Sequence, residues 1–95
     1  MINPQKRSVA MITGASSGIG LAIAHTLAQQ GYNLALCARR QDRLTQAKSD
    51  LSQHGVEVLT QVVDLRDEAE ILDFFAAVKA KWGQLDVLVN NAGLG

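Results

Sequence analysis

The sequence has few of the features that mark secreted or membrane-spanning proteins. Its single cysteine, Cys37, cannot form an internal disulfide, which is typical of a reducing compartment. Cys37 lies in an apolar run, so we expect a buried small side chain and not a reactive thiol. No apolar run approaches the roughly 18 residues that a membrane span needs, and no signal-peptide pattern opens the chain. We therefore expect a cytoplasmic protein without a membrane partner.

An excess of charge of one sign is also missing. Nine basic and nine acidic residues cancel, so the net charge gives no indication of a nucleic-acid partner. His25 has no second metal-ligating residue at a suitable spacing, and we expect a helix-surface residue and no metal site. The 95 residues, 47% of them hydrophobic, suffice for one small domain with a filled core.

A glycine-rich turn stands between a strand-like run at 8–12 and a helix-like pattern from residue 21. Such a turn offers backbone N–H groups and the positive end of a helix dipole to a phosphate, although three glycines alone can also be only a turn. We expect Gly14 to allow the tight turn, Gly18 to let a pyrophosphate approach, and Gly20 to let helix and strand pack closely. No Gly-Lys-Ser/Thr follows, which excludes a P-loop. The turn reads Thr13-Gly14-Ala15-Ser16-Ser17-Gly18-Ile19-Gly20.

Apolar patterning predicts strands that alternate with helices. We expect strands at 8–12, from residue 32 or 33 to 38, at 56–63 and at 86–89. The helices are expected at 18–30, from the basic run at 39–43 to about residue 53, and at 68–81. Right-handed crossovers on the order β-α-β-α-β-α-β give an open parallel sheet with helices on both faces, an α/β fold. The apolar stripe that we expect on the last helix consists of Ile71, Leu72, Phe75 and Val78.

The polar and glycine clusters all follow predicted strands, at 14–20, 39–40, 64–65 and 90–93. The carboxyl ends of parallel strands meet at one edge of a sheet, and ligands of such sheets bind there. The sequence therefore predicts one binding site built from four separate segments.

Arg39 and Arg40 stand where an acidic residue usually binds the adenosine ribose of NAD. An arginine there can pair with a 2′-phosphate, which favours NADP over NAD, with hydroxyl contacts from Ser16 and Ser17. The alternative is a solvated basic helix start, which the helix dipole disfavours unless an anion is near.

Two further clusters leave alternatives open. Asp64 can accept a hydrogen bond from the adenine amino group beside the Leu65 backbone, or it can be the N-cap of the next helix. Asn90 and Asn91 can hold neighbouring loops by side-chain hydrogen bonds, or they can belong to a simple tight turn.

Together these segments resemble the short-chain dehydrogenase/reductase family. The turn at 13–20 matches the family's Thr-Gly-x-x-x-Gly-x-Gly motif, residues 86–93 are similar to its strand-four signature, and Asp64-Leu65 is similar to its adenine-contacting pair. The resemblance covers essentially the whole chain, which corresponds to the first half of a typical member. We therefore expect residues 1–95 to be the N-terminal part of a longer NAD(P)-binding domain.

The resemblance implies a Rossmann-type parallel sheet of four strands with flanking helices. It also implies hydride transfer between NADP, with NADPH favoured over NADH, and a small-molecule alcohol or carbonyl, in a homo-oligomer when the protein is full length. The cofactor-binding residues that it implies are Gly14, Ser16, Ser17, Gly18, Ile19, Gly20, Arg39, Arg40, Asp64, Leu65, Asn90, Asn91, Ala92 and Gly93.

The family's catalytic residues have no counterpart in this chain. They are a Tyr-x-x-x-Lys pair, a preceding serine and a further asparagine, whereas the single tyrosine here, Tyr32, is followed four residues later by Leu36. We expect no catalysis by the 95 residues alone. The apolar run at 86–89 would be an exposed edge if the sheet ended there, which favours a truncated chain. The alternatives are a non-catalytic dinucleotide-binding module or regulator, and a fragment with a vestigial site.

Overall fold

The chain folds around one parallel sheet. The computed structural model describes residues 7–16 and 18–91. Its sheet has four strands in the order β3-β2-β1-β4, and every pairing is parallel. The predicted fold class and element order are confirmed. The elements are β1 (Val9–Thr13), α1 (Gly18–Gln29), β2 (Asn33–Ala38), α2 (Gln41–Ser52), β3 (Val58–Val62), α3 (Glu68–Trp82) and β4 (Val87–Asn90).

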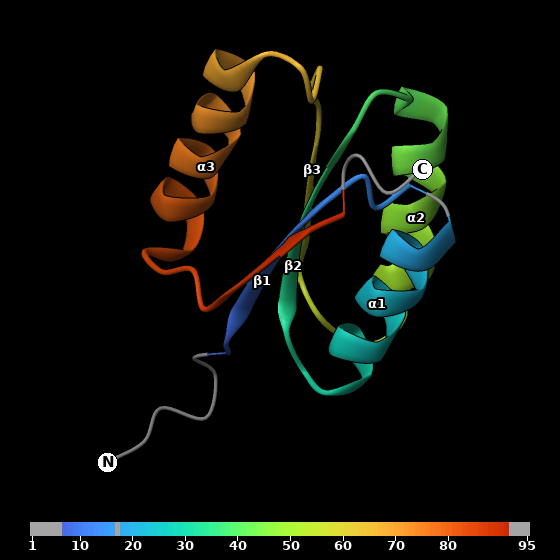
Figure 1. Ribbon diagram of the computed structural model, residues 1–95. Coiled ribbons are helices and arrows are strands. Elements are labelled where there is room, and N and C mark those ends of the chain that lie inside the picture. Colours follow the sequence, from blue (N-terminus) through green and yellow to red (C-terminus); the bar gives the residue numbers. More distant parts are fainter. Residues whose placement is uncertain (1–6, 17, 92–95) are drawn as a thin grey trace.

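The central strands β1 and β2 are buried along their whole length. Helices cover both faces of the sheet, with α1 and α2 on one side and α3 on the other (Figure 1). A strand covered on both faces needs apolar residues in succession, which explains the unbroken run at 34–38. The outer strands β3 and β4 are only partly buried.

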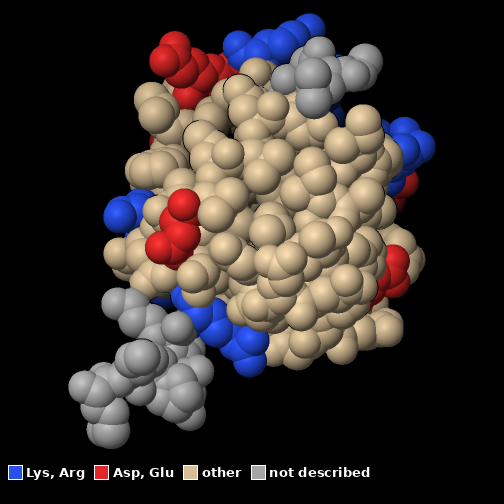
Figure 2. Space-filling model, turned by 60° about the horizontal axis from the view of Figure 1, so that its bottom comes forward, with Lys and Arg blue, Asp and Glu red and all other residues tan. Residues whose placement is uncertain are grey.

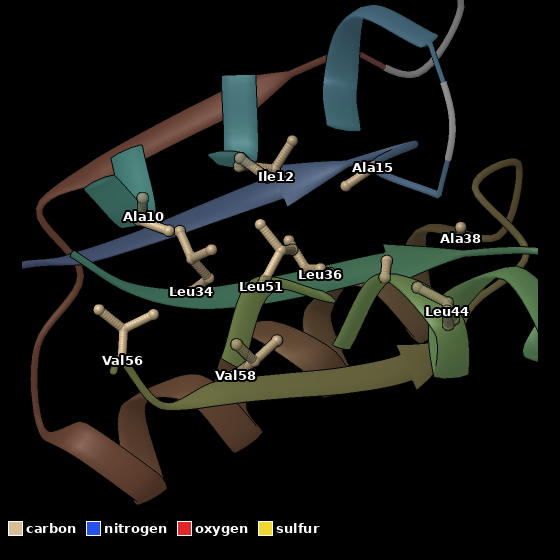
Figure 3. Packing of buried hydrophobic residues seen from close by; sticks show 13 residues of the cluster. Ala10, Ile12, Ala15, Leu34, Leu36, Ala38, Leu44, Leu51, Val56 and Val58 are labelled. Atoms are coloured by element: carbon tan, nitrogen blue, oxygen red, sulfur yellow. The ribbon is translucent and has the colours of Figure 1, made fainter. Parts of the chain in front are cut away.

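Successive residues of a central strand point into different cores. Ala10, Ile12, Leu34 and Leu36 pack towards α1 and α2, whereas Val9, Met11, Ala35 and Cys37 pack towards α3. Figure 3 shows the first core, in which Leu44 and Leu51 of α2 lie over β2. Burial of a leucine of this kind contributes roughly 2 kcal/mol, so these two side chains fix α2 on the sheet.

Cys37 is fully buried, and its burial raises the pKa of the thiol to about 11. The prediction of an unreactive small core residue agrees with this environment. No helix within residues 7–16 and 18–91 has the length and apolar character needed to cross a membrane.

The helices end and begin where the sequence signals predict, within a residue or two. Gly31 and Gly83, with φ of 91° and 73°, follow α1 and α3 in the left-handed conformation that favours glycine. Asp67 caps α3, because its side chain accepts a hydrogen bond from the Ala69 N–H. The strands β1 and β4 lie one residue later than predicted, and β3 is shorter than the predicted 56–63.

The predicted apolar stripe of α3 is wrong in part. Phe74 and Val78 are fully buried, whereas Leu72 and Phe75 are 60% and 40% exposed. Phe74 and Val78 are four residues apart and therefore share the helix face that meets the sheet. Leu72 and Phe75 lie on the flank of that face and line a hollow of about 240 Å³ with Leu88 of β4. The apolar surface of α3 is thus wider than the face that the described residues cover.

Candidate functional site

The carboxyl ends of the strands meet at one edge of the sheet, as predicted. Thr13, the last residue of β1, pairs with Cys37 of β2 on one side and with Asn90 of β4 on the other. Ala38 pairs with Val62 of β3. The glycine turn, the arginines, the segment from Asp64 and Asn91 therefore all leave the sheet at the same edge, which is the upper edge in Figure 1.

The glycine turn has a conformation that other residues rarely adopt. Gly14 and Gly18 have φ of 66° and 61°, and the Gly14 N–H donates to the Cys37 carbonyl at 2.9 Å. A Cβ at Gly18 would meet no atom of residues 7–16 or 18–91 within 4 Å. Gly18 and Ile19 begin α1 and are both exposed among the described residues, and the first N–H groups of a helix have no partner within it, so this helix start can offer them to an anion.

Position 20 requires glycine because of packing and not because of its backbone conformation. A Cβ at this position would lie 2.6 Å from the Asn91 Nδ2 atom and 2.6 Å from the Gly14 carbonyl oxygen. No side chain fits in that space, because real contacts of this kind are longer. The prediction that Gly20 allows close packing of helix and strand is confirmed, and the neighbour that requires it is Asn91.

Asn91 and Thr13 join the end of β4 to the glycine turn. The Asn91 Nδ2 atom donates to the Gly14 carbonyl at 3.0 Å, and the Asn91 N–H donates to the Thr13 hydroxyl at 3.0 Å. The Thr13 hydroxyl donates in turn to the Asn90 Oδ1 atom at 3.1 Å. The prediction that the two asparagines hold neighbouring loops is confirmed. The role of the Thr13 hydroxyl was missed, although its place at the end of an otherwise apolar strand was a signal.

The two arginines after β2 have different surroundings. Arg40 forms a bidentate ion pair with Asp42 in the first turn of α2, which lowers the pKa of the Asp42 carboxyl. The Asp42 carboxylate is thus an anion near the positive end of the α2 dipole, where a basic residue alone would be unfavourable. Arg39 forms no hydrogen bond or ion pair with any residue among 7–16 and 18–91, and it lines the hollow described next.

A hollow of about 210 Å³ lies between the ends of β2 and β3. Its polar lining is Arg39, Asp64, Arg66 and Glu70, and Val62 and Val63 supply the apolar part. Arg66 and Glu70 were not predicted as site residues. Their positions two and six residues after Asp64 place them in the turn and the first turn of α3, and this proximity was the available signal.

Asp64 is held by its neighbours at the rim of this hollow. Its carboxylate accepts from the Arg66 side chain at 3.2 and 3.3 Å and from the Arg66 N–H at 3.0 Å. The Arg66 guanidinium is the main cause that lowers the pKa of the Asp64 carboxyl, and the charge of Arg39 lowers it further. The N-cap alternative for Asp64 is wrong, because Asp67 caps α3.

The remaining predicted residues lie around the same edge. Ser16 is half-buried in the glycine turn, and Ile19 at the start of α1 is 65% exposed. Leu65 is half-buried and packs against the core on the α3 side. Ser17, Ala92 and Gly93 lie outside the described residues.

Comparison with known proteins finds one family over almost the whole chain. Residues 8–95 match the family described as short chain dehydrogenase. The chain is also 47% identical over 87 residues to a Streptomyces violaceoruber protein named for a ketoacyl reductase of granaticin polyketide synthase, and the match covers 92% of this chain and 32% of that protein.

Solved structures agree with this match. A variant of actinorhodin polyketide ketoreductase with NADPH is 42% identical, with a TM-score of 0.88 over 97% of this chain and 35% of that chain. L-Sorbose reductase from Gluconobacter frateurii, complexed with NADPH and L-sorbose, is 44% identical, with a TM-score of 0.88 over 93% of this chain and 34% of that chain. The chain thus spans about a third of the length of these relatives. The family match, these identities and the shared fold agree, and the chain belongs to the short-chain dehydrogenase family.

Proposed function

We propose that this chain is the NADP(H)-binding part of an oxidoreductase that interconverts an alcohol and a carbonyl by hydride transfer. The observation that carries the proposal is the link between Asn91 and the glycine turn, which fixes an anion-accessible helix start at the meeting point of the strand ends. The pyrophosphate of the dinucleotide binds at this turn, on N–H groups between Gly14 and Gly20 with Ser16 and Ser17 beside them.

Arg39 is the residue that we assign to the 2′-phosphate of NADP. Arg39 lines the hollow beside the end of β2, and its side chain has no hydrogen-bonding partner among residues 7–16 and 18–91. Arg40 is already paired with Asp42, so it contributes mainly through its charge. No carboxylate directly follows β2 to bind a ribose diol, which supports NADP over NAD. Both solved relatives described above carry NADPH.

The adenine ring binds along the hollow between β2 and β3. Asp64 accepts a hydrogen bond from the adenine amino group, and the Leu65 backbone completes the contact. Val62 and Val63 supply the apolar floor that a purine ring requires. The Asp64 carboxylate keeps acceptor capacity for this purpose, because each of its oxygens has two lone pairs and Arg66 uses only part of them.

Asn90 and Asn91 hold the turn beside the adenosine, with Ala92 and Gly93 following them, and Ile19 covers the open start of α1. The bound nicotinamide supplies a hydride donor or acceptor, and this chain supplies binding and orientation only. Tyr32 packs against the core at the opposite edge of the sheet, just before the first residue of β2. It is too remote from the strand ends to donate a proton there.

We assign the catalytic residues to a further part of a longer domain, to which this chain contributes the cofactor-binding part. Exposed apolar side chains support this, because Leu72, Phe75 and Leu88 border one hollow and Leu88 is 58% exposed on the edge strand β4. Figure 2 shows a face on which residues other than Lys, Arg, Asp and Glu form most of the surface.

The direction that we propose is reduction of a carbonyl, because the granaticin and sorbose relatives are both named as reductases. The test measures oxidation of NADPH by the whole protein with a ketoacyl thioester, a ketose and a simple aldehyde. We expect turnover with at least one carbonyl, and NADPH binding without turnover by residues 1–95. Binding without turnover by the whole protein would instead identify a non-catalytic module or regulator, and no dinucleotide binding would identify a vestigial site.

A further inference from the structure

Two histidines from different helices meet on the surface. The His25 Nδ1 atom of α1 lies 3.2 Å from the Nε2 atom of His54, which follows α2. Their rings are edge to face, with centroids 5.4 Å apart and planes at 78°. These are the only two histidines of the sequence. The spacing of residues along the chain did not predict a partner for His25. His25 and His54 are 29 positions apart, and only the fold brings them together.

The backbone holds both rings in place. His25 lies within α1, about 10 Å along the helix axis from Gly18. The His54 N–H donates to the Leu51 carbonyl at 3.1 Å, and Gly55 follows with φ of 82° and an N–H bond to Ser52. Leu51 is fully buried, so His54 is attached to a firmly packed helix end. His25 is half-buried and His54 is exposed, so an ion can reach the pair from solvent.

The separation of the two nitrogens matches the distance between two imidazole ligands of one metal ion. With metal–nitrogen bonds of about 2.0–2.1 Å, a tetrahedral angle places two ligand nitrogens about 3.3 Å apart, and a right angle places them about 2.9 Å apart. The observed 3.2 Å lies between these values. The two nitrogens therefore already have the separation of a ligand pair, and rotation of the rings turns both lone pairs towards one ion.

We propose that His25 Nδ1 and His54 Nε2 form a binding site for a divalent transition-metal ion of the Zn²⁺, Ni²⁺ and Cu²⁺ class, with water in the remaining positions. These ions prefer imidazole nitrogen, whereas Mg²⁺ and Ca²⁺ need oxygen ligands. Within residues 7–16 and 18–91 no third His, Cys, Asp or Glu joins the pair. Two protein ligands make this a weaker site than a closed structural zinc site, with affinity in the order Cu²⁺ above Ni²⁺ and Zn²⁺.

The proton balance of metal binding is simple. In the hydrogen-bonded pair, one of the two facing nitrogens carries a proton and the other accepts it, in an arrangement that depends on the tautomer. With metal bound, both facing nitrogens present lone pairs, and the ring protons occupy His25 Nε2 and His54 Nδ1. The ring that donates in the hydrogen-bonded pair therefore changes tautomer, the other neutral ring keeps its tautomer, and no proton is released.

The site is separate from the dinucleotide edge. His54 lies in the connection from α2 to the start of β3, at the amino-terminal edge of the sheet, whereas the glycine turn and Arg39 lie at the carboxyl-terminal edge. A metal ion here cross-links α1 and α2 in the folded state only. It stabilises the folded chain by mass action without touching the residues assigned to the cofactor.

The experiment uses the protein without a histidine tag, titrated with Cu²⁺ followed by electron paramagnetic resonance and with Zn²⁺ followed by calorimetry. We expect one equivalent of Cu²⁺ with two nitrogen ligands, and a Zn²⁺-dependent rise in Tm. The variants His25→Gln and His54→Gln each lower affinity at least about tenfold, because one imidazole ligand is lost. The exposed neighbour Gln53→Ala serves as the matched control and keeps the affinity.

Equal affinities of the unaltered protein and the His25→Gln/His54→Gln double variant would overturn the proposal. A one-nitrogen Cu²⁺ signal in the unaltered protein would do the same. Both glutamine variants should show a cooperative unfolding transition in the absence of metal, which shows that they are folded. The proposal does not depend on the oxidoreductase function.

Discussion

The Asn91 side-chain amide donates a 3.0 Å hydrogen bond to the Gly14 carbonyl, across 77 positions of the chain. The same amide nitrogen lies 2.6 Å from the position that a Cβ on Gly20 would occupy. One side chain from β4 thus holds the first glycine of the turn and excludes any side chain at the last. This relationship explains why a glycine turn after β1 and an asparagine after β4 occur together in this chain.

Asn91→Ala removes the bond to Gly14 and leaves the turn without its support from β4. We expect a loss of about 1 kcal/mol in the free energy of unfolding, the usual net value of one hydrogen bond. Dinucleotide affinity falls as well, because the Gly14–Gly20 turn loses its fixed geometry. Urea unfolding and a dinucleotide titration measure the two effects. Unchanged dinucleotide affinity in this variant would contradict the role of Asn91.

Gly20→Ala places a methyl group against Asn91 and the Gly14 carbonyl. We expect a destabilisation of about 1–3 kcal/mol, typical of overpacking. Gly18→Ala is the matched control, because its cost comes from the positive φ alone and no atom lies near its Cβ.

A double-mutant cycle with Asn91→Ala separates the two causes. Gly20→Ala should show a coupling energy with Asn91→Ala, whereas Gly18→Ala should show none. Additive effects for the Gly20 pair would mean that the close approach to Asn91 does not limit this position. Thermal or urea unfolding of the single and double variants supplies the measurement.

Arg39→Asp replaces a guanidinium that has no ion-pair partner among the described residues with a carboxylate. A charge-assisted hydrogen bond contributes about 1.5–3 kcal/mol, so we expect NADPH affinity to fall at least about tenfold. NADH affinity rises or stays the same, because a carboxylate can accept from the ribose hydroxyls. Arg40→Ala is the control and has a smaller effect, since Arg40 is paired with Asp42. An equal loss from both variants would show that position 39 is not the discriminator.

Arg66→Ala removes the group that lowers the pKa of Asp64. We expect that pKa to rise towards its ordinary value of 3.8, which an NMR titration of the carboxyl measures. A lowered carboxyl pKa stabilises the fold above the unfolded-state value and loses this contribution as the pH falls through the folded-state value. The stability difference between the two proteins therefore begins to shrink at about pH 4 and disappears once the pH is below the lowered folded-state pKa of Asp64. The stability difference is small at neutral pH, because the side chains of Arg66 and Asp64 are both exposed.

Arg40→Ala is the control for that titration as well. It should raise the pKa of Asp42 and leave that of Asp64 unchanged, because Arg40 pairs with Asp42 alone. An Asp64 pKa that does not respond to Arg66→Ala would show that the ion pair does not form in solution.

Local sequence signals predict much of this architecture. Apolar runs, glycines after helices and polar clusters after strands predict the parallel sheet, its element order and the edge where Gly14, Arg39, Asp64 and Asn91 gather. These signals are local because strand and helix periodicity is a property of neighbouring residues.

Contacts between distant segments were not predictable in the same way. The ion pair of Arg66 with Asp64, the difference between Arg39 and Arg40, and the meeting of His25 with His54 depend on side-chain geometry in the folded chain. The stripe of α3 was predicted with Leu72 and Phe75 because both are apolar, and this helix has apolar surfaces both towards the sheet and on its exposed side. Periodicity alone does not tell which of these surfaces faces the sheet.

The central claim is that the strand ends of this chain form one NADP site, with the pyrophosphate on the glycine turn and the 2′-phosphate on Arg39. Dissociation constants of the unaltered protein for NADPH and NADH test it most directly, measured by calorimetric titration at one fixed ionic strength. We predict binding of both dinucleotides, with NADPH at least about tenfold tighter, since the charge-assisted pairing with Arg39 is available to NADPH alone. Equal dissociation constants, or no binding of either dinucleotide, would contradict the account.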